Sequence, residues 1–234
     1  METQIENYID YLNSVTHASA NTIASYRRDL KKMSRFFADR QCMDVRELRG
    51  TDLNSYVLDM ESHGMSTATI SRSIASMKSF FLYLLKQGEI TEDYADALKP
   101  PKIEKKAPET LSIEEINLLL DQPSRLTPKE IRDKAMLELL YATGMRVSEL
   151  INLKITDVNL TMNYILCRDA SKERVIPIEN IAKMALENYI KSVRESISHG
   201  SMFLFTNMKG QPMTRQGFWK LIKAYAAKAG IEKD

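Results

Sequence analysis

The sequence predicts a mainly α-helical protein with an all-α first domain and an α+β second domain. Apolar residues recur at helical spacing throughout 2–97, without the alternation that strands show. The pattern breaks at 98–110, where prolines and lysines without periodicity predict an extended tether. Helical spacing then resumes, interrupted by one pair of β-like segments. We therefore expect a helical domain over 1–97, a basic Pro-rich linker over 98–110 and a second domain with a small β-hairpin over 111–234.

Four or five helices are expected in the first domain. In the segment 19–38, apolar residues recur every three or four positions, and a set of basic residues lies off that stripe. In the segment 67–87, Arg72 and Lys78 also lie off the apolar stripe. Residues with known capping roles mark the helix ends, with Ser19 and either Ser66 or Thr67 as N-caps and Gly88 as a C-terminal stop.

The second domain should consist of helices around one hairpin. Ser112 begins a Ser-Ile-Glu-Glu sequence that fits a capping box. Proline after Thr127 suits the first turn of a helix that runs to Tyr141. The β-like segments are 164–167 and 174–178, and the polar turn between them favours a hairpin. Helices are expected at about 179–197 and 214–229, separated by the short apolar run 203–205.

Composition is that of an ordinary globular protein and gives no sign of a metal site. Of the 234 residues, 44% are hydrophobic and 27% are charged, and the net charge is +2. Cys42 and Cys167 are too few and too far apart for a disulfide framework or a metal site, and the three histidines are scattered. No apolar run approaches the length of a membrane span, and the N-terminus is acidic where a signal peptide would be basic. We expect a cytoplasmic protein without a membrane role and without a metal.

The most informative stretch is Ala142–Leu150, where Arg146 stands at an expected helix start and Glu149 follows three residues later. Side chains at this spacing share a helix face, so the carboxylate can hold the guanidinium in one orientation. A held guanidinium suits a phosphate, which it can bind through two hydrogen bonds. Taken alone, the pattern Gly-x-Arg-x-x-Glu is weak, and a local surface pair is the better explanation until its context supports a function.

This stretch resembles the first catalytic motif of the tyrosine recombinases (the lambda-integrase family, Xer-like), in which the arginine grips the scissile phosphate. The hairpin sequence Lys-Glu-Arg-Val-Ile-Pro-Ile and the later Met213–Trp219 resemble family features in the family's order. The resemblance implies a core-binding (SAM-like) domain followed by a catalytic domain that holds Arg146 and Glu149. It also implies double-stranded DNA as substrate, other recombinase protomers as partners in a tetramer on two sites, and strand exchange through a 3′-phosphotyrosine without a cofactor.

The hairpin departs from the family pattern. Xer-type members usually carry the catalytic lysine in a Gly-Lys-Gly turn, whereas the turn here is Arg168-Asp169-Ala170-Ser171. An aspartate at that place cannot donate a proton to a leaving alkoxide, and its charge would repel phosphate. Either Lys172 or Arg168 serves as the acid, or the acid is missing. We select Lys172 because it is the hairpin's one lysine, although a solvated turn residue is an almost equal alternative.

The remaining catalytic groups of the family have no counterpart in these residues. His17, His63 and His199 are not followed three positions later by arginine, so the sequence contains no His-x-x-Arg motif. The tyrosines of the second domain stand at positions unlike the nucleophile's, and we expect each to be a core or interface aromatic: Tyr141, Tyr164, Tyr189 and Tyr225. The sequence therefore resembles a recombinase truncated inside its catalytic domain, with no nucleophile.

Candidate DNA contacts come from charge and from the resemblance. Basic helix faces and the lysine-rich linker suit a surface that tracks the phosphate backbone, although such faces are usually only solvated and neighbours such as Asp29 dilute the charge. Trp219 is expected in the core. The resemblance adds helix starts at Asn21-Thr22, at Thr69–Arg72 and at Arg215-Gln216, where amide dipoles assist phosphate binding. The candidate contacts are Asn21, Thr22, Arg27, Arg28, Arg72, Lys78, Lys105, Arg215 and Gln216.

Three functions are compatible with parts of this pattern. The first is site-specific DNA recombination of the Xer or integrase type. The second is a non-catalytic DNA-binding module, a shortened or degenerate relative that occupies a recombination site. The third, a helical protein-interaction scaffold, is disfavoured because the motifs match in order across nearly the whole chain.

Overall fold

A computed structural model describes the chain except for residues 43, 103–106, 108, 125, 170–171 and 234, and it describes the backbone but not the side chain of Asp169. Two compact units follow one another along the chain, Met1–Lys106 and Ala107–Asp234. The boundary between the units falls inside the predicted linker, and Leu98, at the first position of that linker, is buried in the core of the first unit.

The described residues of the first unit form helices and connecting turns and contain no strand, as the sequence predicts. Ser19 and Ser66 cap their helices by accepting hydrogen bonds from the backbone N–H groups of Thr22 and Thr69. Gly88, with φ of 72°, lies two residues beyond the last helix, in the left-handed region that glycine adopts easily. The helices are α1 (Glu2–Ser14), α2 (Ala20–Ala38), α3 (Gly50–Ser62) and α4 (Thr67–Lys86), with a 3-10 turn at Val45–Glu47 between α2 and α3.

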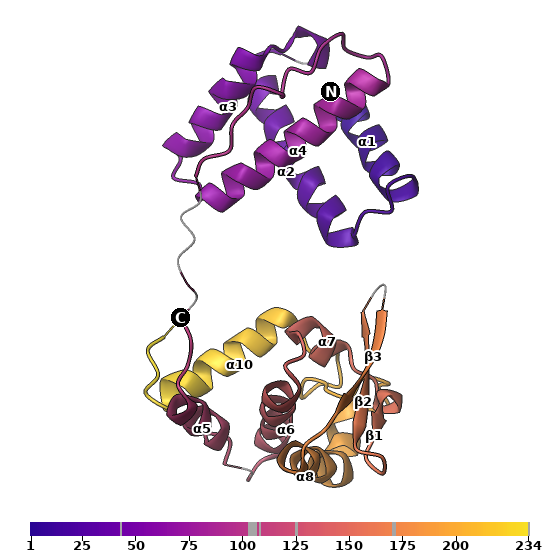
Figure 1. The fold of residues 1–234 in the computed structure, drawn as a ribbon, viewed down its shortest axis with the longest axis vertical. Helices are drawn as coiled ribbons and strands as arrows, with labels where there is room; N and C mark the ends of the chain where they lie inside the picture. The colour runs from indigo at the N-terminus through magenta and orange to yellow at the C-terminus, as the bar shows by residue number, and fades with distance from the viewer. Residues whose placement is uncertain (43, 103–106, 108, 125, 170–171, 234) are drawn as a thin grey trace. The chain divides into compact units, whose positions relative to one another are not determined.

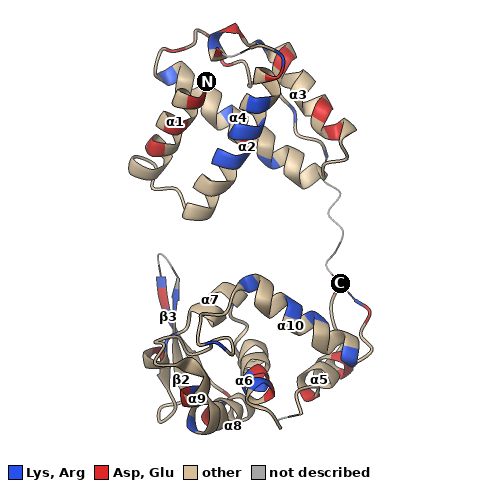
Figure 2. Ribbon diagram, turned by 180° about the vertical axis from the view of Figure 1, so that it is seen from behind, with Lys and Arg blue, Asp and Glu red and all other residues tan. Residues whose placement is uncertain are grey.

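Aromatic side chains form the centre of the first unit's core. Tyr8 of α1 meets Phe80 of α4 edge to face, with ring centroids 5.5 Å apart, and its hydroxyl donates to Ser79 at 2.6 Å. Phe36 and Phe37 of α2 pack against Tyr56 of α3. These contacts hold α2 with its apolar stripe inward, which leaves its basic positions on the outer face (Figure 2).

The second unit is α+β and helix-dominated, which confirms the predicted fold class. Its elements are α5 (Ile113–Asp121), α6 (Pro128–Thr143), α7 (Val147–Asn152), the strands β1 (Val158–Asn159), β2 (Tyr164–Asp169) and β3 (Lys172–Pro177), α8 (Asn180–Tyr189), α9 (Glu195–Ser198) and α10 (Arg215–Lys228). Figure 1 shows α6 in the middle of the unit, with α8 against it and the sheet to one side.

The predicted hairpin is present as β2 and β3, paired antiparallel with Cys167 opposite Arg174. A short strand, β1, adds to β2 on the other side, so the hairpin is part of a three-stranded sheet. Strand β1 was not predicted, because two residues are too few to show alternation. The expected helix at 179–197 is also broken, by a π-helical turn at Ile190–Arg194 between α8 and α9.

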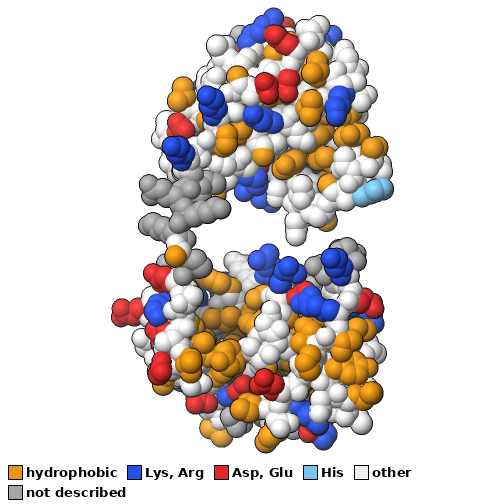
Figure 3. Space-filling view, in the orientation of Figure 1, with side chains coloured by type: hydrophobic (Ala, Val, Ile, Leu, Met, Phe, Trp, Pro, Cys, Tyr) orange, Lys and Arg blue, Asp and Glu red, His pale blue; other side chains and the backbone are white. Residues whose placement is uncertain are grey.

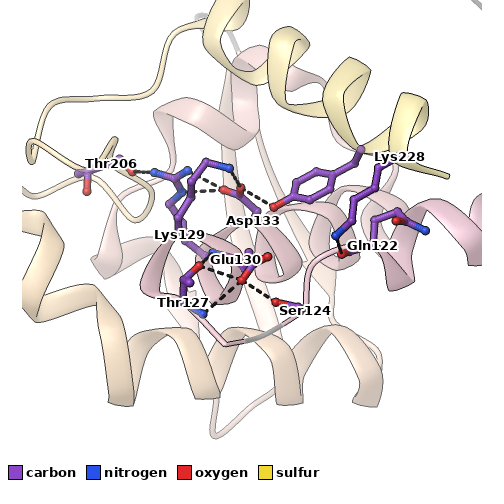
Figure 4. A network of polar contacts seen from close by, with 10 residues as sticks. Gln122, Ser124, Thr127, Lys129, Glu130, Asp133, Thr206 and Lys228 are labelled. Carbon is purple, nitrogen blue, oxygen red and sulfur yellow. Dashed lines mark hydrogen bonds and ion pairs between the residues drawn. The ribbon is translucent and has the colours of Figure 1, made fainter.

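A network of buried charges joins α6 to α10 (Figure 4). Asp133 is fully buried and accepts hydrogen bonds from the guanidinium of Arg132 and from the hydroxyl of Tyr225. Arg132 also donates to the carbonyl oxygen of Thr206 at 2.9 Å, and Lys129 approaches Asp133 at 2.9 Å. Every charge in this network therefore has a partner, as burial requires.

Candidate nucleic-acid interface

Arg146 is the N-cap residue of α7. The turn between α6 and α7 places its side chain at the surface. Gly144 closes α6 in the left-handed conformation, with φ of 59°, and Met145 is buried beside it. The next residue, Arg146, has extended backbone angles, and its side chain is 70% exposed. The Gly-Met-Arg sequence therefore fixes the backbone at this point while presenting the guanidinium to solvent.

Glu149 accepts hydrogen bonds from more than one element. Its carboxylate accepts from the backbone N–H of Arg146 at 2.6 Å and from both terminal nitrogens of Arg174, on β3, at 2.7 and 2.9 Å. The guanidinium of Arg146 lies farther away, at 3.5 Å. The expected pair of Glu149 with the Arg146 guanidinium is therefore present, but the bonds from the Arg146 backbone and from Arg174 are shorter. The helix start is anchored to the sheet by this carboxylate.

The pKa of Glu149 reflects these contacts. The guanidinium of Arg174, together with the backbone N–H of Arg146, holds the pKa of Glu149 to about 2 against the opposing effect of burial. Its side chain is 4% exposed and stays ionised at neutral pH. The sequence alone suggested no role for Arg174, because it lies 25 positions from Glu149 and only the pairing of β2 with β3 brings it there.

The hairpin end holds the two cations considered as the catalytic acid. Lys172, the first residue of β3, is exposed, and residues 170–171 beside it lie outside the described part of the chain. Arg168, on β2, is held by two carboxylates, those of Asp157 and Glu173. Because two anions surround the charge of Arg168, Lys172 remains the better candidate.

The start of α10 supplies further exposed polar groups. Thr214 caps the helix by accepting from the backbone N–H of Gly217 at 3.0 Å, and Arg215 and Gln216 are exposed in the first turn. Trp219 is 59% exposed, so the prediction that it lies in the core was wrong. The buried stripe of α10 runs through Phe218 instead, one position away, which turns Trp219 outward.

In Figure 3, Lys and Arg side chains gather along the edge of the second unit that carries α7, the start of α10 and the hairpin end. Figure 2 shows the same charge as blue segments along α10 and near the hairpin tip. The edge therefore offers a positive surface to an anion.

The basic face of α2 is less uniform than its sequence suggests. Arg28 is exposed on it, as are the neighbouring Lys32 and Arg35. Arg27, however, pairs with Glu6 at 3.1 Å. Asn21 is exposed and Thr22 half-buried in the first turn, where the hydroxyl of Thr22 bonds to that of Ser19 at 2.8 Å.

Two other residues of the first unit that were predicted to contact DNA bind groups of the protein itself. Arg72 donates two hydrogen bonds to Asp29, at 2.8 and 2.9 Å, and Asp29 is buried rather than part of the surface charge. Lys78 donates to the backbone oxygen of Asp96 at 2.8 Å. Lys105 lies outside the described residues. Arg72 therefore tethers α4 to α2, and its charge is already compensated.

We expect Arg72→Ala to destabilise the first unit by about 2–3 kcal/mol, because it leaves Asp29 buried without its partner. Asp29→Ala should cost less, since the remaining Arg72 side chain is 40% exposed and can be hydrated. Urea unfolding of both variants tests the difference. If Arg72→Ala leaves stability unchanged and weakens DNA binding, the arginine is a direct DNA contact instead.

Arg146→Ala should change the free energy of unfolding by less than about 0.5 kcal/mol, because the side chain is 70% exposed and the bond from the backbone N–H to Glu149 survives the change. Urea unfolding monitored by circular dichroism gives the comparison. A loss above about 2 kcal/mol would show that the arginine supports the fold rather than a ligand.

Two of the second unit's tyrosines are core residues, as expected. Tyr189 and Tyr225 are buried, and burial raises the pKa of Tyr189 to about 12 and that of Tyr225 well above its usual range. Tyr164 is half-buried, and Tyr141 is 54% exposed on α6, so it is not a core aromatic. Over the described ranges, no cluster of three His, Cys, Asp or Glu side chains could hold a metal ion, and no helix is long and apolar enough to cross a membrane.

Comparison with known proteins identifies the family. Residues 109–234 match the family described as Phage integrase family, and residues 5–88 match the Phage integrase, N-terminal SAM-like domain. The chain belongs to the phage integrase family. This membership confirms the resemblance to the tyrosine recombinases and the SAM-like first domain.

Curated members of the family match over almost the whole chain. Tyrosine recombinase XerC of Roseiflexus sp. (strain RS-1) is 38% identical over 237 residues, which cover 99% of this chain and 76% of the relative. Tyrosine recombinase XerD of Oceanobacillus iheyensis is also 38% identical, over 100% of this chain and 80% of the relative.

Solved structures share the integrase fold. A lambda integrase dimer bound to a COC′ core site has a TM-score of 0.73 at 16% identity, covering 100% of this chain and 80% of that one. The post-cleavage complex of XerH recombinase with palindromic difH DNA has a TM-score of 0.74 at 20% identity, covering 100% and 74%. At these identities the likeness concerns the fold.

Proposed function

We propose that this phage integrase family member binds duplex DNA and acts in site-specific recombination of the Xer type. The observation that carries the proposal is the exposed guanidinium of Arg146, set at a helix start whose backbone is tied to the sheet through Glu149. A cation held in this way suits a phosphodiester. The names of the relatives support the same function, since both are tyrosine recombinases.

The proposed roles of the individual residues follow from their positions. Arg146 would bind the scissile phosphate, and Lys172 would protonate the leaving 5′-oxygen from the hairpin end. Arg215 and Gln216 would contact the backbone at the start of α10, a 14-residue helix whose first amide groups favour anions. Arg28 and Asn21 would contact DNA from α2.

Partners and compartment follow from the reaction. Lambda integrase has been solved as a tetramer bound to a Holliday junction, and we propose that this protein also joins other protomers, four on two sites. In the family reaction a phosphotyrosyl linkage conserves the energy of the broken bond, so no cofactor is proposed. A DNA substrate supports a cytoplasmic location, which we also propose. No comparison favours the alternative of a non-catalytic module.

On a nicked duplex that traps covalent intermediates, we expect these 234 residues to bind without forming a denaturant-resistant adduct. Tyr189 and Tyr225 are buried, and the sequence contains no His-x-x-Arg motif to complete the phosphate site. Electrophoresis under denaturing conditions, with the same duplex unnicked as control, gives the answer. An adduct that maps to Tyr141 or Tyr164 would show that the nucleophile has been overlooked.

A further inference from the structure

We propose that Trp219 is a DNA-contact residue, whose ring packs against a deoxyribose of the duplex next to a phosphate bound by Arg215. The inference rests on the proposed DNA-binding function and adds an apolar contact to an interface otherwise formed by charged and polar groups. Its basis is an exposed tryptophan beside an open cavity between α7 and the start of α10.

Trp219 is the chain's one tryptophan, and it is 59% exposed on α10. Exposing a large aromatic ring to water is unfavourable, and tryptophan is among the residues most enriched in binding surfaces. The Lys223 ammonium lies 6.0 Å from the ring centre, and more than half of the tryptophan remains exposed beside it. Within the described part of the chain, the contacts of the ring therefore leave a large apolar area to a partner.

The cavity beside Trp219 has a volume of about 370 Å³. Val147 of α7 and Ile222 of α10 line it with half-buried apolar side chains, and the buried Phe218 forms part of its wall. The two helices lie side by side at this point (Figure 1). Cavities that bind small organic groups start at about 300 Å³, so this one has room for a sugar ring.

The polar groups at the rim of the cavity favour a DNA backbone over an apolar partner. Arg215 and Gln216 line the cavity and are exposed in the first turn of α10. Arg215 precedes Trp219 by four positions and Gln216 precedes it by three, so both lie beside the ring on the helix surface. Among the described residues, no carboxylate forms an ion pair with Arg215. Its charge is therefore available to an anion next to the ring.

This pairing of a cation with an apolar ring matches the order of groups along a DNA strand. Deoxyribose presents carbon-bound hydrogens between successive phosphates, and contacts to phosphate and sugar make up most of a protein–DNA interface. Stacking on a base would need an unpaired base, which an intact duplex does not offer. Arg215 would then bind one phosphate while Trp219 covers the neighbouring sugar. Because the ring carries no charge, its contact adds affinity without releasing counterions.

The first measurement uses the wild-type chain, in which tryptophan fluorescence reports Trp219 alone. Acrylamide quenching of that fluorescence is compared with and without a saturating unlabelled duplex. We expect the duplex to lower the quenching constant by about threefold or more, because contact residues lose most of their exposed surface in an interface. Unchanged quenching at saturation overturns the inference. Quenching that falls as the protein concentration rises without DNA shows that a second copy of this chain covers the ring, and overturns it too.

The second measurement separates the apolar contact from the phosphate contacts by titrating a labelled duplex at several salt concentrations. W219A should weaken binding by about tenfold at every salt concentration and leave the slope of log affinity against log salt unchanged, since no charge is lost. R215Q should lower the slope by about one. M184A is the matched control, because Met184 is 70% exposed on α8 of the same unit and does not line this cavity. Its affinity should be that of wild type.

Circular dichroism of each variant establishes that it is folded at the temperature of the titration. If W219A is unfolded, the quenching of wild type decides the question. A folded W219A with wild-type affinity, or R215Q with the wild-type slope, overturns the inference. Salt-dependent duplex binding that leaves Trp219 unshielded overturns the inference alone, whereas absence of salt-dependent binding by wild type overturns the proposed function with it.

Discussion

Asp133→Ala should lower the unfolding free energy of the second unit by about 3–5 kcal/mol, a large effect for one substitution. The carboxylate is fully buried, and its closest partner, Arg132, has a side chain that is only 4% exposed. Removing the carboxylate leaves Arg132 with the carbonyl oxygen of Thr206 as its remaining acceptor. Among the residues that the structure describes, Arg132 then has no carboxylate partner, and the neighbouring Lys129 is itself a cation (Figure 4). The cost arises from the uncompensated charge rather than from lost packing.

Two variants give matched comparisons for Asp133→Ala. Tyr225→Phe removes one hydrogen bond to the same carboxylate and should cost about 1 kcal/mol. Glu187→Ala removes an exposed ion pair with Lys191 in the same unit and should cost less than about 0.5 kcal/mol. Urea unfolding, monitored by circular dichroism, ranks the three variants by their loss of unfolding free energy. An Asp133→Ala effect no larger than that of Tyr225→Phe would show that the network does not hold α6 to α10.

Local signals in the sequence were sufficient to place most elements. Ser19, Ser66, Ser112 and Thr127 each accept a backbone hydrogen bond at the helix start that their sequence predicts. The hairpin was predicted from two short segments rich in β-branched and aromatic residues. The caps depend on neighbours three positions away, and the two hairpin segments are joined by a short turn, so a single sequence contains the necessary information.

Pairings over long sequence distances were not predictable in the same way. Arg72 was expected to contact DNA and Asp29 to dilute the charge of a basic face. Only the packing of α4 against α2 reveals that the two bind each other. Glu149 was correctly expected to contact an arginine side chain. Its closest side-chain partner, however, is Arg174, which lies on the sheet. Trp219 was misplaced because neighbouring side chains of an α-helix point about 100° apart, so Phe218 is buried while Trp219 is exposed.

The candidate site was predicted only in part, because some of its contacts are local in sequence and others depend on tertiary structure. Arg146 was expected at a helix start with Glu149 on its first turn, and both lie there because the Gly144 turn and the capping contact are local. The involvement of Arg174 depends on tertiary structure. The roles proposed for Lys172, Arg215 and Gln216 remain predictions that DNA binding must test.

The central claim, that this phage integrase family member binds duplex DNA through its phosphates, is tested most directly by the salt dependence of its duplex affinity. Among the described residues, the exposed cations on the faces considered for DNA contact include Arg28, Lys32 and Arg35 of the first unit and Arg146, Lys172 and Arg215 of the second. Neutralising about six phosphates gives a slope of log affinity against log salt of about −5, or a loss on the order of a thousandfold between about 50 and 200 mM salt. Fluorescence anisotropy with a labelled duplex measures it, and a duplex of unrelated sequence should give a similar slope. Affinity that does not change over this range would contradict the claim.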